Sequence, residues 1–230
     1  MSNKIINFYE QKKVKKFMPK SHNPEYQNHL IKVPFRGIII GSSGSGKTNM
    51  LMNLISIMKG TFNHIYIYTR AEEPLYNYLQ SQIKDDMLTI SYDLDDCRNF
   101  NEENYYGQSL VIFDDQVNEK NQRCISELYI RGRKKNISLL YLTQSYYKVP
   151  KTVRLQCQYI FVIKVSGVRD LKMMLMEYSL GATKEQLQNM YNYCCNNGGS
   201  FGNFLMVDLN APQDKTYRLN WNEFLDPKDF

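Results

Sequence analysis

A glycine-rich segment at residues 41–48, GSSGSGKT, has the composition and spacing of a loop that holds a phosphate chain. It matches the pattern G-x-x-x-x-G-K-[ST] at every position. The glycines let the chain curl so that backbone N–H groups point at one anion, while the lysine adds a charge and the threonine a ligand for Mg²⁺. We therefore expect ATP and Mg²⁺ to bind through Gly41, Ser42, Ser43, Gly44, Ser45, Gly46, Lys47 and Thr48.

Two carboxylates follow the apolar run SLVIF at 109–113, which predicts a buried strand. Asp114 comes at the end of that strand, where we expect it to hold Mg²⁺ through water. Asp115 is the candidate that orients or deprotonates an attacking water. Strands often end in aspartate at a turn, so both roles depend on the phosphate loop lying at the same edge of the sheet.

A glutamine and three arginines complete the candidate catalytic side chains. Gln144 ends another apolar run, where it would contact the γ-phosphate or the lytic water, or alternatively only cap the strand. Arg131 and Arg133 precede that strand, at the opposite edge of the sheet, so they could reach a neighbouring subunit's nucleotide. The alternative for both is a solvated basic patch or a DNA contact. Arg154 is a second candidate for the arginine that acts in trans.

These residues must be positioned by strands that alternate with helices. Strand-like runs lie at 37–41, 64–69, 88–92, 109–115, 137–144 and 159–164, and helical patterns near 47–58, 73–84, 118–133 and 149–156. Several of the runs are apolar throughout, as expected for strands that are buried on both faces. The alternation indicates an α/β fold with a mostly parallel sheet that helices cover on both sides.

The last third of the chain has a different pattern. Residues 168–178 and 183–195 are predicted to form two helices, with Thr183 as the cap of the second. The segments 203–209 and 215–221 flank the turn-rich sequence NAPQD and indicate a β-hairpin.

Positive charge is concentrated at the N-terminus. Residues 1–36 carry eight Lys or Arg against two Glu, which accounts for the whole net charge of +6. Three prolines in this segment disfavour a continuous helix. We therefore divide the chain into a basic arm at 1–36 and a phosphate-loop domain at 37–230. The arm is expected either to contact a polyanion or to be a solvated, partly disordered terminus.

The composition is that of a globular protein inside a cell. The 230 residues are enough for one α/β domain, and no apolar run approaches the roughly 18 residues that span a bilayer. The N-terminus is too polar for a secretion signal. The five cysteines include no C-x-x-C spacing and the three histidines fit no ligand pattern, so we expect reduced thiols and no zinc site.

Several segments together resemble a known family. GSSGSGKT, LVIFDDQ, RGRKKNISLLYLTQSYYKVPKTVRLQC and the C-terminal third are similar to the genome-packaging ATPases of large DNA viruses and virophages, the poxvirus-type members of the FtsK–HerA superfamily. The resemblance covers roughly residues 35–225. Many NTPases share the first two segments. The third is more specific, because it joins an arginine, a strand and a glutamine in the family's order.

The resemblance implies a RecA-like, three-layer P-loop core that assembles into a ring, a pentamer or a hexamer, and translocates double-stranded DNA into a preformed capsid. The expected partners are DNA, further copies of the chain and a capsid or portal-vertex component. The expected location is the viral factory in the host cytoplasm, or the virion. Lys148 and Lys151 are candidates for pore loops on the DNA, with a plain solvated turn as the alternative.

Carried over residue by residue, the resemblance implies that Asp114 binds the metal, Gln144 senses the γ-phosphate and Arg133 is the arginine before the sensor strand. One departure is that the family's second carboxylate is commonly glutamate. Asp115 is one methylene shorter, so it needs a closer water or a shifted strand, and this weakens its assignment as the base.

Other functions remain as alternatives. Another nucleic-acid-dependent ATPase or helicase would use the same residues. A nucleotide or polynucleotide kinase would use the phosphate loop and RGRKK as a lid, although no acceptor motif is evident. A DNA-binding or scaffold protein would retain only the nucleotide fold. The chain contains no N-K-x-D motif of a GTPase and no L-S-G-G-Q motif of a transporter ATPase.

Overall fold

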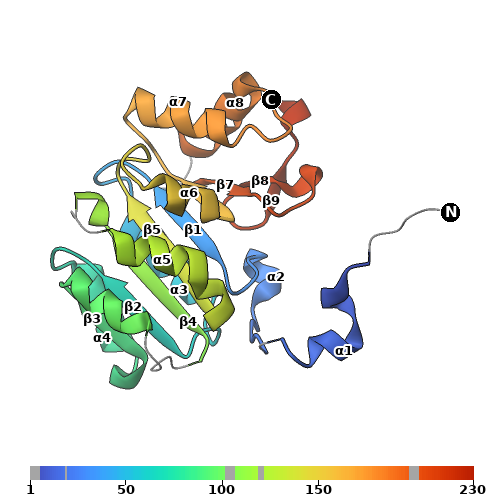
Figure 1. The fold of residues 1–230 in the computed structure, drawn as a ribbon. Coiled ribbons are helices and arrows are strands. Elements are labelled where there is room, and N and C mark those ends of the chain that lie inside the picture. The colour runs from blue at the N-terminus through green and yellow to red at the C-terminus, as the bar shows by residue number, and fades with distance from the viewer. Residues whose placement is uncertain (1–5, 19, 102–106, 119–121, 197–201) are drawn as a thin grey trace.

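The computed structural model of the chain describes residues 6–18, 20–101, 107–118, 122–196 and 202–230 (Figure 1). Within these residues, nine strands form one sheet in the order β3-β2-β4-β5-β1-β6-β7-β8-β9. The first six in sequence are parallel: β1 (Arg36–Ile40), β2 (His64–Tyr68), β3 (Leu88–Ser91), β4 (Ser109–Asp114), β5 (Ile137–Thr143) and β6 (Tyr159–Val162). The last three are antiparallel: β7 (Leu205–Asp208), β8 (Tyr217–Leu219) and β9 (Glu223–Leu225). The predicted, mostly parallel sheet is confirmed.

Helices cover both faces of the sheet (Figure 1). One face packs against α3 (Lys47–Ile57) and α4 (Pro74–Gln82). The other face packs against α5 (Arg123–Arg131), α6 (Lys151–Gln156), α7 (Val168–Glu177) and α8 (Lys184–Asn196). Two short helices, α1 (Lys12–Lys15) and α2 (Tyr26–His29), precede the first strand. Among the described residues, no helix has the length and apolarity to cross a membrane.

Burial on both faces explains why the strands are apolar throughout. Successive side chains of a strand point to opposite faces, so Ile38 and Ile40 join the core under α5 to α8 while Ile39 joins the core under α3 and α4. In β4, Val111 and Phe113 join the first of these cores. Because β5 pairs in parallel with both β1 and β4, the carboxyl ends of these three strands meet at one edge of the sheet.

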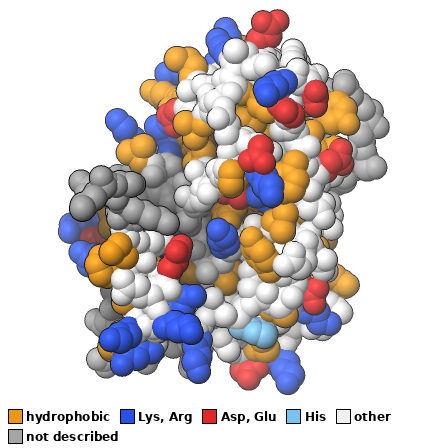
Figure 2. Space-filling model, turned by 90° about the vertical axis from the view of Figure 1, so that its right-hand side faces the viewer, with side chains coloured by type: hydrophobic (Ala, Val, Ile, Leu, Met, Phe, Trp, Pro, Cys, Tyr) orange, Lys and Arg blue, Asp and Glu red, His pale blue; other side chains and the backbone are white. Residues whose placement is uncertain are grey.

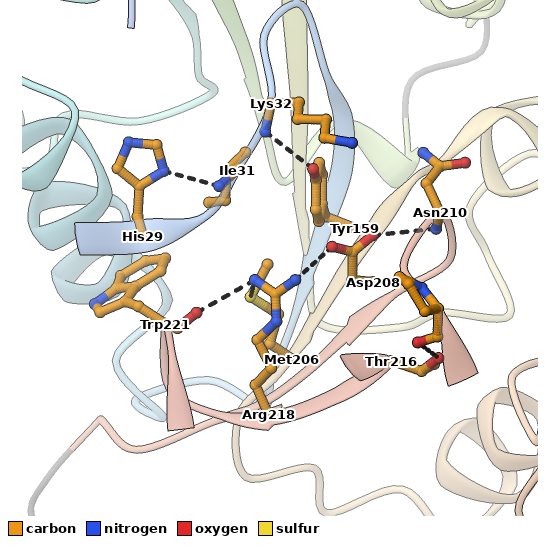
Figure 3. Close-up of polar contacts among 11 residues, drawn as sticks. His29, Ile31, Lys32, Tyr159, Met206, Asp208, Asn210, Thr216, Arg218 and Trp221 are labelled. Carbon is orange, nitrogen blue, oxygen red and sulfur yellow. Dashed lines mark hydrogen bonds and ion pairs between the residues drawn. The ribbon is translucent and has the colours of Figure 1, made fainter. Parts of the chain in front are cut away.

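The chain becomes part of the packed body before residue 36. Ile31 and Phe35 are fully buried, whereas the side chains from residue 6 to residue 13 are exposed. The backbone N–H of Lys32 donates to the Tyr159 hydroxyl at 3.0 Å (Figure 3). From the sequence, residues 1–36 are predicted to be an arm, because Ile31 and Phe35 lie among prolines and polar residues and form no periodic pattern. Within the described residues of the predicted arm, exposed side chains predominate before His29, and buried ones begin there.

The exposed part of the arm is apolar as well as basic. Lys and Arg side chains lie beside exposed apolar side chains on the side of the molecule that carries the N-terminal segment (Figure 2). The apolar members in the described part of the arm are Ile6, Phe8, Tyr9, Phe17 and Met18.

The C-terminal third extends the sheet with the predicted hairpin and one further strand. β7 and β8 pair as expected. β9 pairs with β8 and was not predicted, because its three residues are too few to form a recognisable pattern. Arg218 in β8 donates to Asp208 in β7 at 2.5 Å, and both side chains are buried (Figure 3). Thr183 caps α8 as predicted, because its hydroxyl accepts the N–H of Gln186 at 3.2 Å.

Candidate nucleotide-binding site

The phosphate loop lies at the carboxyl edge of the sheet, between the ends of two neighbouring strands. It joins β1 to α3, and β1 pairs with both β5 and β6. The N–H of Gly41 donates to the carbonyl of Thr143 at 3.1 Å, and the N–H of Ser42 donates to the carbonyl of Lys164 at 3.0 Å. The start of the loop is thereby tied to the end of β5 on one side and to the residues just after β6 on the other.

The loop needs glycine at the positions where the sequence has it. Gly44 and Gly46 have φ angles of 71° and 95°, in the left-handed region that glycine adopts without strain. At Gly41 a Cβ atom would lie 2.3 Å from the hydroxyl oxygen of Ser45. That hydroxyl is buried and has no hydrogen-bond partner among the described residues. A buried donor without a partner inside the loop fits the oxygen of a bound phosphate.

Lys47 is held inside the curl of the loop. Its ammonium group donates to the carbonyl oxygens of Gly41 and Ser42, at 3.0 and 3.2 Å. Burial lowers the pKa of Lys47, while the negative charges of Asp115 and Asp114 raise it. The structure therefore brings the predicted lysine and both predicted carboxylates into electrostatic contact, although 67 and 68 residues separate them in sequence.

Asp114 is the last residue of β4 and is held by a tyrosine of the neighbouring helix. The Tyr76 hydroxyl in α4 donates to Oδ2 of Asp114 at 2.6 Å. Burial raises the pKa of Asp114, while the bond from Tyr76 and the charge of Lys47 oppose that rise. A divalent cation would hold the group in its ionised form. Thr48, the other predicted metal ligand, is the second residue of α3, on the turn that follows the loop.

Asp115 and Gln144 meet at the same edge. Asp115 follows β4 with a φ angle of 54°, and its N–H donates to the carbonyl of Leu142 in β5 at 3.1 Å. The amide nitrogen of Gln144 then donates to Oδ2 of Asp115 at 2.9 Å. The candidate base and the candidate sensor are therefore direct partners, and both are accessible from solvent.

Arg131 and Arg133 lie at the opposite edge of the sheet, as the order of elements predicts. Arg131 ends α5 and Arg133 follows it, so both precede the start of β5 rather than its end. Both are exposed. Burial lowers the pKa of Arg36 at the start of β1, and the positive charge of Arg133 lowers it further, which places these two cations at the same edge. The arginines are thus far from the phosphate loop of their own chain.

Arg154 is committed to contacts within its own chain. It forms an ion pair with Glu177 of α7, and its guanidinium group lies 4.9 Å from the ring centroid of Tyr146. Its side chain is 9% exposed. In this conformation these contacts occupy the guanidinium of Arg154, and its action in trans stays a prediction. Lys148, a candidate pore-loop residue, donates to the side chain of Asn118 at 3.3 Å, and Lys151 is exposed at the start of α6.

Three residues near the site were not found from the sequence. The N–H of Ser166 donates to the hydroxyl of Ser42 at 2.7 Å. Asp170 in α7 accepts the N–H of Tyr147 at 2.7 Å and the hydroxyl of Ser145 at 3.1 Å. Tyr76 holds Asp114, as described above. Nothing in their local sequence indicates these contacts, because each joins segments more than 20 residues apart.

Most of the chain matches one protein family. The model of the family described as "Poxvirus A32 protein" matches residues 24–208, which is most of the chain. The chain belongs to the poxvirus A32 protein family. Relatives include the DNA packaging protein OPG160 of vaccinia virus, 28% identical over 183 residues, and that of variola virus, 26% identical over 179 residues. Each match spans 72% of this chain and 66% of the relative, just under two thirds of its length.

Solved structures support the fold of this A32 family member. The genome packaging NTPase B204 of Sulfolobus turreted icosahedral virus 2, in complex with ATP-gammaS, matches with a TM-score of 0.61 and 16% identity, over 85% of this chain and 100% of B204. EssC (ATPases 2 and 3) from Geobacillus thermodenitrificans matches with a TM-score of 0.56 and 15% identity, over 86% of this chain and 40% of EssC. These similarities confirm the predicted P-loop ATPase fold.

Proposed function

We propose that this A32 family member is an ATP hydrolase that moves double-stranded viral DNA into a preformed capsid. The observation that carries the proposal is the convergence of the phosphate loop, Asp114 and the Asp115–Gln144 pair at one edge of the sheet. DNA packaging in the names of its relatives supports the biological role. The host cytoplasm or the virion is the proposed location.

The residues divide the chemistry among them. Backbone N–H groups of residues 41–46 and the ammonium group of Lys47 bind the phosphates. Thr48 and Asp114 would hold Mg²⁺, which would neutralise the charge that develops on the phosphates. Asp115 orients the attacking water and accepts its proton, while Gln144 holds the carboxylate of Asp115 in place. When the γ-phosphate leaves, the Gln144 amide loses its contact to that phosphate. The end of β5 and the loop after it then change position.

Neighbouring copies complete the site. Arg133, with Arg131 beside it, faces away from its own phosphate loop and can stabilise transition-state charge only at another copy's nucleotide. Such a head-to-tail contact uses two different surfaces of each subunit, and it closes into a ring. The ring, a pentamer or a hexamer, holds the DNA through contacts to its phosphates. A capsid or portal-vertex component is the proposed docking partner.

Phosphate release from ATP by the purified chain tests this proposal. Mg²⁺-dependent turnover is expected without any acceptor molecule and should rise when long linear duplex DNA is added. Lys47→Ala should reduce turnover at least about 100-fold, because it removes the only side-chain charge that the loop directs at the phosphates. Lys59→Ala, at an exposed lysine just beyond α3, is the matched control and should retain turnover. Undiminished turnover by Lys47→Ala would refute the assignment.

A further inference from the structure

Tyr76 is buried beside the candidate metal site, yet it belongs to none of the motifs. Its side chain is 2% exposed and packs in the core beneath α3 and α4. The hydroxyl donates to Oδ2 of Asp114 at 2.6 Å, a short bond of the kind that an ionised acceptor forms. The ring is therefore fixed by apolar packing, while its single polar atom is directed at the carboxylate.

The order of elements explains why a tyrosine of α4 reaches the end of β4. β2 pairs with β4 in parallel, and Tyr68 at the end of β2 is opposite Phe113. The chain leaves β2 at this edge, and Pro74 begins α4 a few residues later. Tyr76 is the third residue of that helix, so it lies above the end of the strand that carries Asp114.

The tyrosine hydroxyl is suited to hold a carboxylate while leaving part of it available. It has one proton to donate, so it occupies one of the two oxygens of Asp114. A phenol hydroxyl keeps its proton at neutral pH, so it acts as a donor toward the carboxylate. Partners that hydrogen-bond to metal-binding carboxylates orient those ligands.

We propose that Tyr76 is a positioning residue for Mg²⁺: its hydroxyl fixes the Asp114 carboxylate in the orientation that receives the hydrated cation of ATP. The inference rests on the proposed function, because it assigns a role toward the same nucleotide. It predicts that the tyrosine acts through Asp114 and not through the stability of the core.

The test is the Mg²⁺ dependence of nucleotide binding, which does not require turnover. A fluorescent ATP analogue is titrated with Mg²⁺ in the presence of the wild type, of Tyr76→Phe and of Tyr78→Phe. Tyr78 is the control, because it is on the same helix and is 57% exposed. We expect the half-saturating Mg²⁺ concentration to rise about 10-fold or more for Tyr76→Phe, a typical cost of losing such a partner. The control should match the wild type.

A double-mutant cycle separates positioning from packing. Asp114→Ala should itself raise the half-saturating Mg²⁺ concentration, and adding Tyr76→Phe should then cause little further change, since the acceptor of the tyrosine hydroxyl is gone. The proposal would be overturned if Tyr76→Phe had the same effect in the wild type and in the Asp114 variant. It would also be overturned if Tyr76→Phe alone left the half-saturating Mg²⁺ concentration unchanged or lowered it. Should Lys47→Ala bind the analogue as well as the wild type, the proposed function fails instead.

Discussion

His29 is a buried histidine in the N-terminal segment that precedes the first strand. Its ring is fully buried, and Nδ1 accepts the N–H of Ile31 at 2.9 Å (Figure 3). Nε2 is buried without a partner among the described residues. Burial lowers the pKa of His29 to about 4. The folded chain therefore holds a neutral imidazole, and protonation must compete with the packing of residues 29–35.

This residue predicts how stability depends on pH. Between the unfolded pKa of about 6.5 and the folded value, the unfolded chain binds a proton that the folded chain does not, so stability falls as the pH falls. From pH 7 to pH 5.5, the free energy of unfolding should drop by about 1 kcal/mol on account of His29. His29→Asn keeps an acceptor for Ile31 but cannot titrate, so its profile should be flatter by this amount.

Urea unfolding at the two pH values is the measurement for His29. His22→Asn is the matched control, because His22 is exposed and its replacement should leave the slope of the wild type. A profile for His29→Asn that is as steep as the wild type would show that other groups cause the loss.

At the scale of elements, α7 connects the phosphate loop to the loop that follows Gln144. Asp170 on α7 accepts hydrogen bonds from Ser145 and Tyr147, directly after the sensor. Ser166, just before α7, donates to Ser42 of the phosphate loop. The helix and the residue before it therefore contact both segments that the γ-phosphate would touch, so the first turn of α7 should move when that phosphate leaves.

Removing Asp170 tests this coupling. Asp170→Ala leaves the hydroxyl of Ser145 and the N–H of Tyr147 without their acceptor, which should lower the free energy of unfolding by about 1–3 kcal/mol. It should also weaken ATP binding several-fold, because the sensor loop loses its support. Asp214→Ala, at an exposed aspartate away from the site, is the control. Calorimetry measures the change in stability, and nucleotide titration measures the change in ATP affinity. An unchanged ATP affinity would contradict the proposed coupling through α7.

The sequence predicts elements well where their apolar pattern is long, and poorly where packing decides. The six parallel strands follow from apolar runs such as that of β4, because a short run that is apolar on both faces indicates a strand buried on both sides. For the predicted helix at 118–133, the structure has α5 at Arg123–Arg131, and residues 119–121 of the prediction lie outside the described residues. The strand β9 and the packed segment around Ile31 carry too few apolar residues to form a pattern.

The candidate site shows the same division. Local sequence predicts the glycine loop, Asp114 and Gln144, because their roles depend on residue type and on the ends of strands. Tyr76 is 38 residues from its partner, and this contact depends on β2 lying beside β4. The second carboxylate, Asp115, has a left-handed backbone conformation and accepts a hydrogen bond from Gln144, features that the sequence did not predict, and its role as the base stays a prediction.

At the scale of the whole molecule, the chain holds only part of its proposed catalytic machinery around one nucleotide. The phosphate loop and carboxylates are at one edge of the sheet, and Arg131 and Arg133 are at the other. Under the proposed function, a second copy would complete each site by bringing its arginine edge to the phosphate loop. If the proposed arginine acts in trans, an isolated chain should turn over ATP more slowly than an assembled one.

Mixing two inactive variants tests this claim most directly. Lys47→Ala lacks a working phosphate loop and Arg133→Ala lacks the proposed arginine, so each should have little turnover alone. In mixed rings with DNA, the intact loop of one variant meets the intact arginine of the other, and turnover should recover to about a quarter of the wild-type rate if sites act independently. Lys47→Ala mixed with Asp115→Asn, two defects of the same edge, should stay inactive. A Lys47→Ala and Arg133→Ala mixture no more active than its components would contradict the shared site.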